Sequence, residues 1–173
     1  ALHAWADLQG VGSLHGPVAN TYHSTIPEHA SLLWAKLSER TVSDGVPVVG
    51  GNLSVLYSLL GTSYFPDLKG CWLLIEDLDE YLYHIDRMLL AFKLSGVLEG
   101  IHGVLVGSFC ELRDNTKAFG QSKDNPFGRS VNEMIREHVP SGKPIHWDFP
   151  IGHGSQNKPL VLGGGLDVSG FCE

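Results

Sequence analysis

Acidic residues follow an apolar run near the middle of the sequence, among them Glu76, Asp77 and Glu80. The run itself, residues 71–75, is typical of a strand that is buried in a sheet. In a parallel sheet, ligands and reactive side chains gather at the carboxyl ends of the strands. Glu76 is therefore a candidate general base, or a candidate acid that orients a histidine. The alternative for all three acids is that they favour the start of the following helix through its dipole.

The second candidate for chemistry is His153, which lies between Gly152 and Gly154. Two missing side chains leave the backbone free to approach a ligand and leave the imidazole uncrowded. A histidine that only satisfies its own loop is an open alternative. The chain has nine histidines, but it has no His-Glu-x-x-His motif and no two histidines at ligand spacing on one expected helix. No metal is therefore expected.

A third candidate is Gly50-Gly51-Asn52, which leads into an expected helix and could present backbone N–H groups to an anion or a carboxylate. The alternative is a strand-to-helix turn that needs glycines for its backbone. The sequence contains no phosphate loop of the Gly-x-x-x-x-Gly-Lys type, and no Gly-x-Gly-x-x-Gly follows a strand. No nucleotide and no other cofactor is expected.

An attacking group for these residues is harder to find. Ser54, Ser108 and Ser155 each lie near a glycine, but none lies in a Gly-x-Ser-x-Gly elbow. The residues alone therefore indicate a glutamate and a histidine, far apart in sequence, with no partner to activate.

The composition limits what the protein can bind. The 173 residues can hold one domain, or one domain and part of another, and 43% hydrophobic content with 18% charged content is typical of a globular chain. A net charge of −7 argues against nucleic acid or an anionic membrane as the main partner. The three cysteines are widely spaced and support neither a disulfide framework nor a zinc knuckle. With no long apolar run and no signal-peptide pattern, a cytoplasmic setting is expected, although a protein whose signal had been removed would look the same.

The elements that must position these residues alternate along the chain. Ser130 and Glu133 have the spacing of a capping box at the start of a short helix. Residues 158–162 and 166–169, joined by three glycines, are expected to form a closing hairpin, and polar residues 111–129 are expected to form a surface insertion. The alternation predicts an α/β domain, and the hairpin points to a mixed sheet. Strands are expected at 11–18, 46–49, 71–75, 104–109 and 144–148, and helices at 27–37, 53–60, 81–95 and 130–138.

Seven short blocks of this sequence, in this order, resemble the serine LD-carboxypeptidases, a family that includes the microcin C immunity peptidases. The blocks cover nearly the whole chain and are more specific together than any one is alone. They are Gly50-Gly51-Asn52-Leu53-Ser54, Leu60-Gly61-Thr62, Glu76-Asp77 with Glu80, Tyr83-x-Ile85-Asp86-Arg87-Met88-Leu89, Val106-Gly107-Ser108-Phe109, Phe149-Pro150-x-Gly152-His153-Gly154 and Asn157.

The resemblance implies a fold and a set of roles. Residues 46–173 would form a swivelling β/β/α-type carboxyl-terminal domain, after a linker and helix at 26–45 and a helix-strand remnant of a Rossmann-like amino-terminal domain at 1–25. Glu76 and His153 would be two members of a Ser-His-Glu triad, in which the histidine takes the serine proton and the glutamate holds its tautomer. Gly50, Gly51 and Asn52 would bind substrate.

The resemblance also implies a substrate and a missing part. The substrate would be a muropeptide tetrapeptide, cut between the L-centre of a diamino acid and the terminal D-Ala during cytoplasmic recycling of cell-wall peptides, by a homodimer. In the family the serine opens the helix before a strand like residues 11–18, and this sequence begins inside that helix. The nucleophile is therefore expected to be absent, and the chain inactive without the missing amino-terminal domain. Ser63 and Leu82 stand where the family often has proline, and residues 111–129 look longer than usual.

Two other functions remain open. One is a non-catalytic module that binds peptides or carboxylates, or mediates dimerisation, through residues 50–54. The other is an immunity-type peptidase that uses the same triad on a peptide-nucleotide conjugate. Geometry separates the first from the triad, because a working pair needs Glu76 within about 2.6–3.2 Å of His153.

Overall fold

The computed structural model describes residues 45–158, 160 and 162–168 of the chain. The predictions for the amino-terminal remnant at 1–25, the strand at 11–18 and the helix at 27–37 lie outside the described residues, as does the linker at 26–45 except for Gly45.

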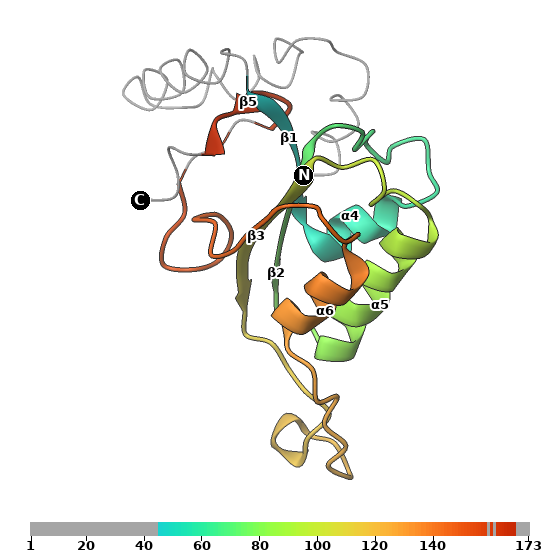
Figure 1. Cartoon of the computed structure of the whole chain (residues 1–173). Helices are drawn as coiled ribbons and strands as arrows, with labels where there is room; N and C mark the ends of the chain where they lie inside the picture. Colours follow the sequence, from blue (N-terminus) through green and yellow to red (C-terminus); the bar gives the residue numbers. More distant parts are fainter. Residues whose placement is uncertain (1–44, 159, 161, 169–173) are drawn as a thin grey trace.

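A mixed five-stranded sheet, in the order β4-β3-β2-β1-β5, forms the centre of the described part (Figure 1). Four strands run parallel, and β5 pairs antiparallel with β1. Strands and helices alternate, so the α/β fold with a mixed sheet that the sequence predicts is confirmed. The strands are β1 (Val46–Asn52), β2 (Trp72–Leu78), β3 (Gly103–Cys110), β4 (Ile145–His146) and β5 (Gly165–Leu166).

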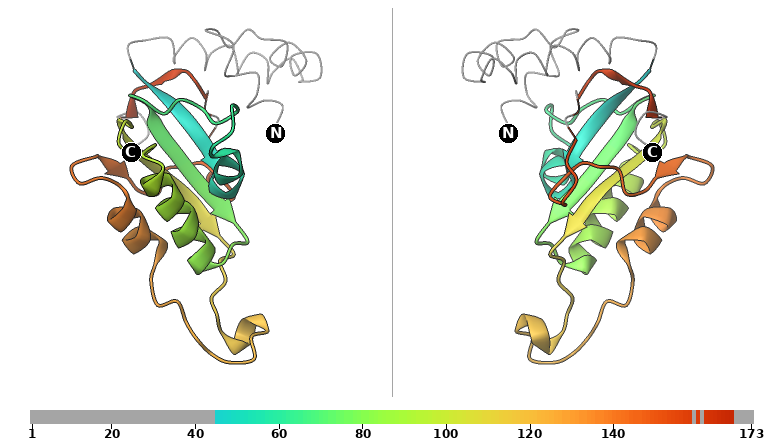
Figure 2. Two further views of the ribbon diagram at one scale, coloured as in Figure 1. Left: turned by 90° about the vertical axis from the view of Figure 1, so that its right-hand side faces the viewer. Right: turned by 90° about the vertical axis from the view of Figure 1, so that its left-hand side faces the viewer.

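Three helices cover one face of this sheet: α4 (Leu53–Leu59), α5 (Leu82–Leu94) and α6 (Val131–His138) (Figure 2). None of the described helices is long and apolar enough to cross a membrane. The predicted capping box opens α6, since Ser130 and Glu133 exchange side-chain and backbone hydrogen bonds. Between β3 and α6 the chain extends away from the sheet and forms one 3-10 turn, η1 (Lys117–Phe119), in the predicted insertion (Figure 1).

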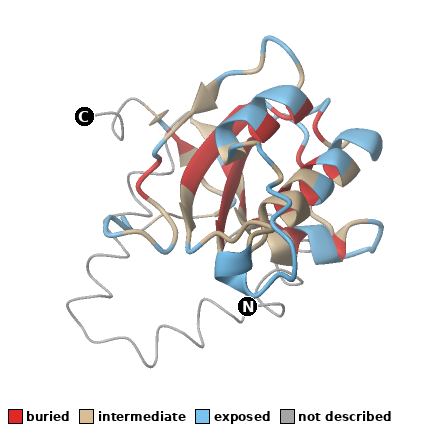
Figure 3. Ribbon diagram, turned by 90° about the horizontal axis from the view of Figure 1, so that it is seen from below, coloured by how far each residue is buried: buried red, intermediate tan, exposed pale blue. Residues whose placement is uncertain are grey.

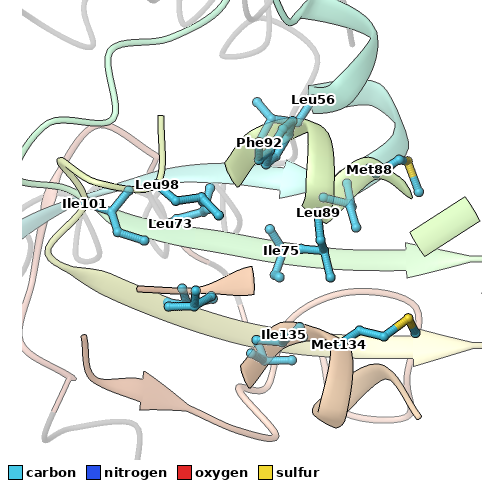
Figure 4. Packing of buried hydrophobic residues seen from close by; sticks show 14 of the residues in the cluster. Leu56, Leu73, Ile75, Met88, Leu89, Phe92, Leu98, Ile101, Met134 and Ile135 are labelled. Carbon is cyan, nitrogen blue, oxygen red and sulfur yellow. The ribbon is translucent and has the colours of Figure 1, made fainter. Parts of the chain in front are cut away.

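Both faces of the central strands are buried. Leu73 and Ile75 of β2 face the helices and form one buried cluster with Leu89 and Phe92 of α5 (Figure 4). Trp72 and Leu74, the neighbours of those β2 residues, pack on the opposite face against the carboxyl-terminal segment. Strand β2 and the first part of β3 are therefore buried, while the helices alternate between buried and exposed residues (Figure 3). Burial on both faces explains the continuous apolar run in β2.

Two sequence predictions are wrong. Strand β2 does not end where its charges begin, because it continues through both acids to Leu78. No strand is described within residues 158–162, and the chain at Leu166 pairs with Val46 of β1 instead of closing a hairpin. Without β5, β1 would present an unpaired edge of N–H and C=O groups, and the returning chain satisfies part of that edge.

Candidate active site

Glu76 and Asp77 are neighbours in sequence but serve opposite faces of the sheet. Side chains alternate along a strand, so Asp77 follows Leu73 and Ile75 to the helical face, and Glu76 follows Trp72 and Leu74 to the other. Their contacts agree: Asp77 bonds to the start of α4, and Glu76 bonds to His153. The strand therefore delivers one acid to each side of the sheet.

Glu76 and His153 form a direct pair. The distance from Glu76 Oε2 to His153 Nδ1 is 2.8 Å, across 77 positions of sequence. Glu76 is only 6% exposed, whereas the His153 side chain is 48% exposed. A carboxylate can only accept, so Nδ1 carries the proton and Nε2 of the neutral ring is left with its lone pair. No other described residue hydrogen-bonds to this imidazole, and the pair can therefore act as a base with its orienting acid.

The loop that carries His153 is attached to strand β3. The backbone N–H of Phe149 donates to Val106 O at 2.8 Å, and that of Ser108 donates to Ile151 O at 2.9 Å. A third bond joins Gly154 N–H to the Oγ of Ser108, also at 2.9 Å. Because β3 is the neighbour of β2 in the sheet, these bonds bring the histidine next to Glu76.

The glycine before His153 permits a very close approach between this loop and the strands. Gly152 has a φ of +115°, and a Cβ there would lie 2.4 Å from Ser108 Oγ and 3.0 Å from Glu76 Oε2. On the strand side, a Cβ at Gly107 would lie 2.6 Å from Ile151 O. The sequence suggests that glycines here let a ligand approach; in the structure they let the loop approach β3 and Glu76.

The pairing of β2 with β3 is irregular beside Glu76. Ile75 pairs with Val106, but Asp77 pairs with Phe109, so two residues of β3 face the one acid. Those two are Gly107 and Ser108. Bulges of this kind re-aim side chains and are common next to active sites. No periodicity in the sequence reveals this bulge or predicts the contact of Ser108 with the histidine loop.

Asp77 has a structural role at the start of α4. It is 1% exposed and accepts hydrogen bonds from Asn52 Nδ2 at 2.7 Å, from Ser54 N–H at 3.0 Å and from Leu78 N–H at 2.9 Å. Burial raises the pKa of this carboxyl above its ordinary value, although these three donors oppose the shift. The sequence offers the alternative that Asp77 favours the start of the helix after β2, which is α5. In the structure Asp77 instead stabilises the start of α4, the helix before β2.

Gly50, Gly51 and Asn52 lie within β1 at the same edge of the sheet, with Asn52 paired to Glu76. A Cβ at Gly50 would lie 1.9 Å from Leu74 O, so packing of the strands already requires that glycine. The Oδ1 of Asn52 caps α4 by accepting from Val55 N–H at 3.0 Å, and its Nδ2 donates to Asp77. The substrate-binding role of these three residues stays a prediction.

The remaining acids of this region hold other elements together. Glu80 contacts His84 Nδ1 at 3.1 Å, one turn along α5. Asp86 contacts His138 Nε2 at 2.8 Å and Arg129 Nη1 at 3.2 Å, and so attaches the end of the insertion and α6 to α5. None of these hydrogen bonds involves Glu76 or His153. Structural pairing is therefore enough to account for Glu80 and Asp86.

The described serines do not complete a triad. Ser54 Oγ donates to Asn52 Oδ1 at 2.8 Å, and Ser108 Oγ accepts from Gly154 N–H. No described serine hydrogen-bonds to His153, so within the described part of the chain no attacking group is bonded to the Glu76–His153 pair.

Comparison with known proteins gives one family. Residues 46–168 match the model described as the LD-carboxypeptidase C-terminal domain. The chain is 31% identical, over 96% of its length, to a putative carboxypeptidase of Synechocystis sp., and 38% identical, over 67% of its length, to the probable murein peptide carboxypeptidase of Bacillus subtilis. It covers 57% and 34% of those two proteins, so it spans about half or less of the curated relatives it matches.

The fold comparison agrees with the sequence comparison. The crystal structure of muramoyltetrapeptide carboxypeptidase from Oxalobacter formigenes is similar, with a TM-score of 0.52 and 29% sequence identity. The similarity covers 65% of this chain and 37% of that one.

Proposed function

Because this chain belongs to the LD-carboxypeptidase family, and matches the carboxyl-terminal domain of that family, we propose that Glu76 and His153 are the acid and the base of a Ser-His-Glu triad. The 2.8 Å bond between Glu76 Oε2 and His153 Nδ1 is the observation that carries the proposal. It meets the distance that such a pair requires, and it fixes the tautomer that leaves Nε2 ready to accept a proton.

In the proposed reaction, a serine Oγ attacks the carbonyl carbon of the scissile peptide bond while His153 Nε2 takes the hydroxyl proton. His153 then gives that proton to the leaving amine as the peptide C–N bond breaks. The amino acid departs, and the acyl group stays on the serine as an acyl-enzyme. A water molecule, deprotonated by the same nitrogen, hydrolyses the acyl-enzyme and restores the serine. Glu76 accepts from Nδ1–H throughout and stabilises the imidazolium, and its burial strengthens that interaction because little water screens it.

The attacking serine would come from the nucleophile-bearing amino-terminal domain that the family resemblance implies. No described serine bonds to His153, which supports this division of the triad. If the serine comes from that domain, the 173-residue chain alone releases no amino acid at an enzyme-like rate.

The proposed substrate is a muropeptide tetrapeptide that loses its terminal D-Ala. Two relatives support this choice by name, the probable murein peptide carboxypeptidase and the muramoyltetrapeptide carboxypeptidase. The backbone at Gly50, Gly51 and Asn52, next to Glu76 at the edge of the sheet, is proposed to hold the substrate. A cytoplasmic setting and a homodimer belong to the same proposal and rest on the family resemblance.

The decisive experiment measures release of D-Ala from a purified muropeptide tetrapeptide. It uses this chain joined to the family's nucleophile-bearing domain, with His153→Ala as the test variant. The matched control is His84→Ala, since His84 also bonds through Nδ1 to a glutamate, at 3.1 Å, on the surface of α5. Loss of about 10³-fold or more in kcat for the first variant and none for the second is expected.

Two results would contradict the proposal. One is unchanged hydrolysis by His153→Ala. The other is D-Ala release at an enzyme-like rate by the 173-residue chain alone, which would mean that the attacking group has been assigned to the wrong part of the protein.

A further inference from the structure

Ser108 bonds to the histidine loop on both sides of His153. Its backbone N–H donates to Ile151 O at 2.9 Å, two residues before the histidine. Its side-chain Oγ accepts from Gly154 N–H at 2.9 Å, one residue after it. A single residue of β3 thus fixes the short segment that carries the imidazole at both of its ends.

The same serine limits the movement of the loop toward the strands. The space that a Cβ of Gly152 would fill is bordered by Ser108 Oγ at 2.4 Å and by Glu76 Oε2 at 3.0 Å. A side chain at position 152 would therefore collide with these two oxygens at the present position of the loop. Movement away from the strand would break the bond between Gly154 N–H and Ser108 Oγ.

His153 has little else to set its direction. Its ring is nearly half exposed, and among described residues it hydrogen-bonds only to Glu76. Whether Nδ1 reaches Glu76 therefore depends on where the loop holds the Cα of the histidine. Replacing a residue that holds a reactive imidazole in place lowers the reaction rate strongly, because small displacements of the imidazole disturb the catalytic geometry.

From these contacts we infer that the Ser108 hydroxyl is a positioning group for His153, which keeps the imidazole in its bond to Glu76. This inference rests on the function proposed above for the Glu76–His153 pair. Ser108 is not the attacking group, because its oxygen is bonded to a backbone N–H and not to the histidine.

The test variant is Ser108→Ala, and the matched control is Ser130→Ala. Ser130 Oγ also accepts from a backbone N–H, that of Glu133 at 3.3 Å, but it lies at the start of α6 and has no hydrogen bond to the described histidine loop. Both variants lose a hydrogen bond from a backbone N–H, and Ser130→Ala also loses the bond that Ser130 Oγ donates to Glu133 Oε2 at 2.8 Å. A general loss of stability should therefore affect both, and a positioning role should affect Ser108→Ala alone.

Two readouts are needed. In the protein joined to the nucleophile-bearing domain, Ser108→Ala should lower kcat for D-Ala release by about tenfold or more with KM changed by less than about twofold, and Ser130→Ala should leave both unchanged. In this chain, proton NMR should show the His153 Nδ1–H signal, assigned by its loss in His153→Ala, broadened or lost in Ser108→Ala and retained in Ser130→Ala.

Equal kcat values and an intact Nδ1–H signal in Ser108→Ala would overturn the positioning role. If His153→Ala keeps full activity, the function proposed for the pair fails as a whole. If His153→Ala is inactive while Ser108→Ala behaves like Ser130→Ala, only the role of Ser108 is refuted.

Discussion

The carboxylates of Glu76 and Asp77 are adjacent in sequence and lie on opposite faces of one strand, where Glu76 bonds to His153 and Asp77 bonds to the start of α4. The two acids are nearly equally buried, at 6% and 1% exposure. Their hydrogen-bond partners nevertheless give them different roles. The partner of Glu76 is an imidazole, which can take up and release a proton, whereas Asp77 is bonded to amide N–H groups, which do not. Substitutions at the two positions should therefore have different consequences.

Glu76→Gln should remove activity and leave the fold intact. The side-chain amide can donate to Nδ1 of His153, which would place the ring proton on Nε2 and remove the base, and it carries no charge to stabilise an imidazolium. We expect kcat to fall by about 10³- to 10⁴-fold, as when a triad acid becomes its amide. D-Ala release by the protein joined to the nucleophile-bearing domain measures this. Glu80→Gln, which changes the pair with His84, is the control and should retain full activity.

Asp77→Ala should destabilise the protein. Removing the carboxylate leaves Asn52 Nδ2 and the N–H groups of Ser54 and Leu78 without their acceptor beneath the helical layer. We expect the free energy of unfolding to fall by about 2–3 kcal/mol, measured by urea denaturation. Asp67→Ala is the control, because Asp67 accepts a similar backbone bond from Lys69 N–H at 2.9 Å on the exposed surface. An equal loss in the two variants would contradict the buried role of Asp77.

The pH dependence of stability should show the buried state of Asp77. Burial raises the pKa of Asp77 above its ordinary value of 3.8, so just above that pH the folded protein binds more protons at this site than the unfolded chain does. The contribution of Asp77 to the free energy of unfolding is therefore greatest below 3.8 and decreases as pH rises through its folded pKa. Urea denaturation across this range should show the difference between the natural protein and Asp77→Asn decreasing with rising pH.

Glu133 gives the opposite sign and serves as the comparison. Its hydrogen bonds from Ser130 lower its pKa from the ordinary value of 4.5, so its contribution is present above that value and lost as pH falls. The difference between the natural protein and Glu133→Gln should thus increase with rising pH. A difference for Asp77→Asn that also increased with pH would show that the direction of its pKa shift is wrong.

Local features of this fold could be predicted from sequence, and long-range pairings could not. The capping box of Ser130 and Glu133 lies within three residues and depends only on the chain near it. The pairing of Val46 with Leu166, and the bulge that sets Ser108 beside Glu76, depend on contacts between distant segments that no periodicity encodes. The pairing of Glu76 with His153 was predicted only through the family resemblance, since the residues alone gave two separate candidates.

Gly152→Ala tests how closely the histidine loop approaches the strands, and Gly142→Ala is its matched control. Both glycines have positive φ, +115° and +88°, so alanine strains the backbone at either position by about 1–3 kcal/mol. At Gly142 the new Cβ would meet nothing within 4 Å, whereas at Gly152 it would lie 2.4 Å from Ser108 Oγ. Gly152→Ala must therefore displace the loop, or the Ser108 side chain that is bonded to it.

The two alanine variants should differ in activity more than in stability. We expect both to lose stability in urea denaturation. Gly152→Ala alone should lose D-Ala release by about tenfold to 100-fold, since an ångström of displacement at His153 is enough for such a loss. In proton NMR, its His153 Nδ1–H signal should weaken together with kcat. If Gly152→Ala kept the activity of Gly142→Ala, the bond between His153 and Glu76 would not depend on the position of this loop.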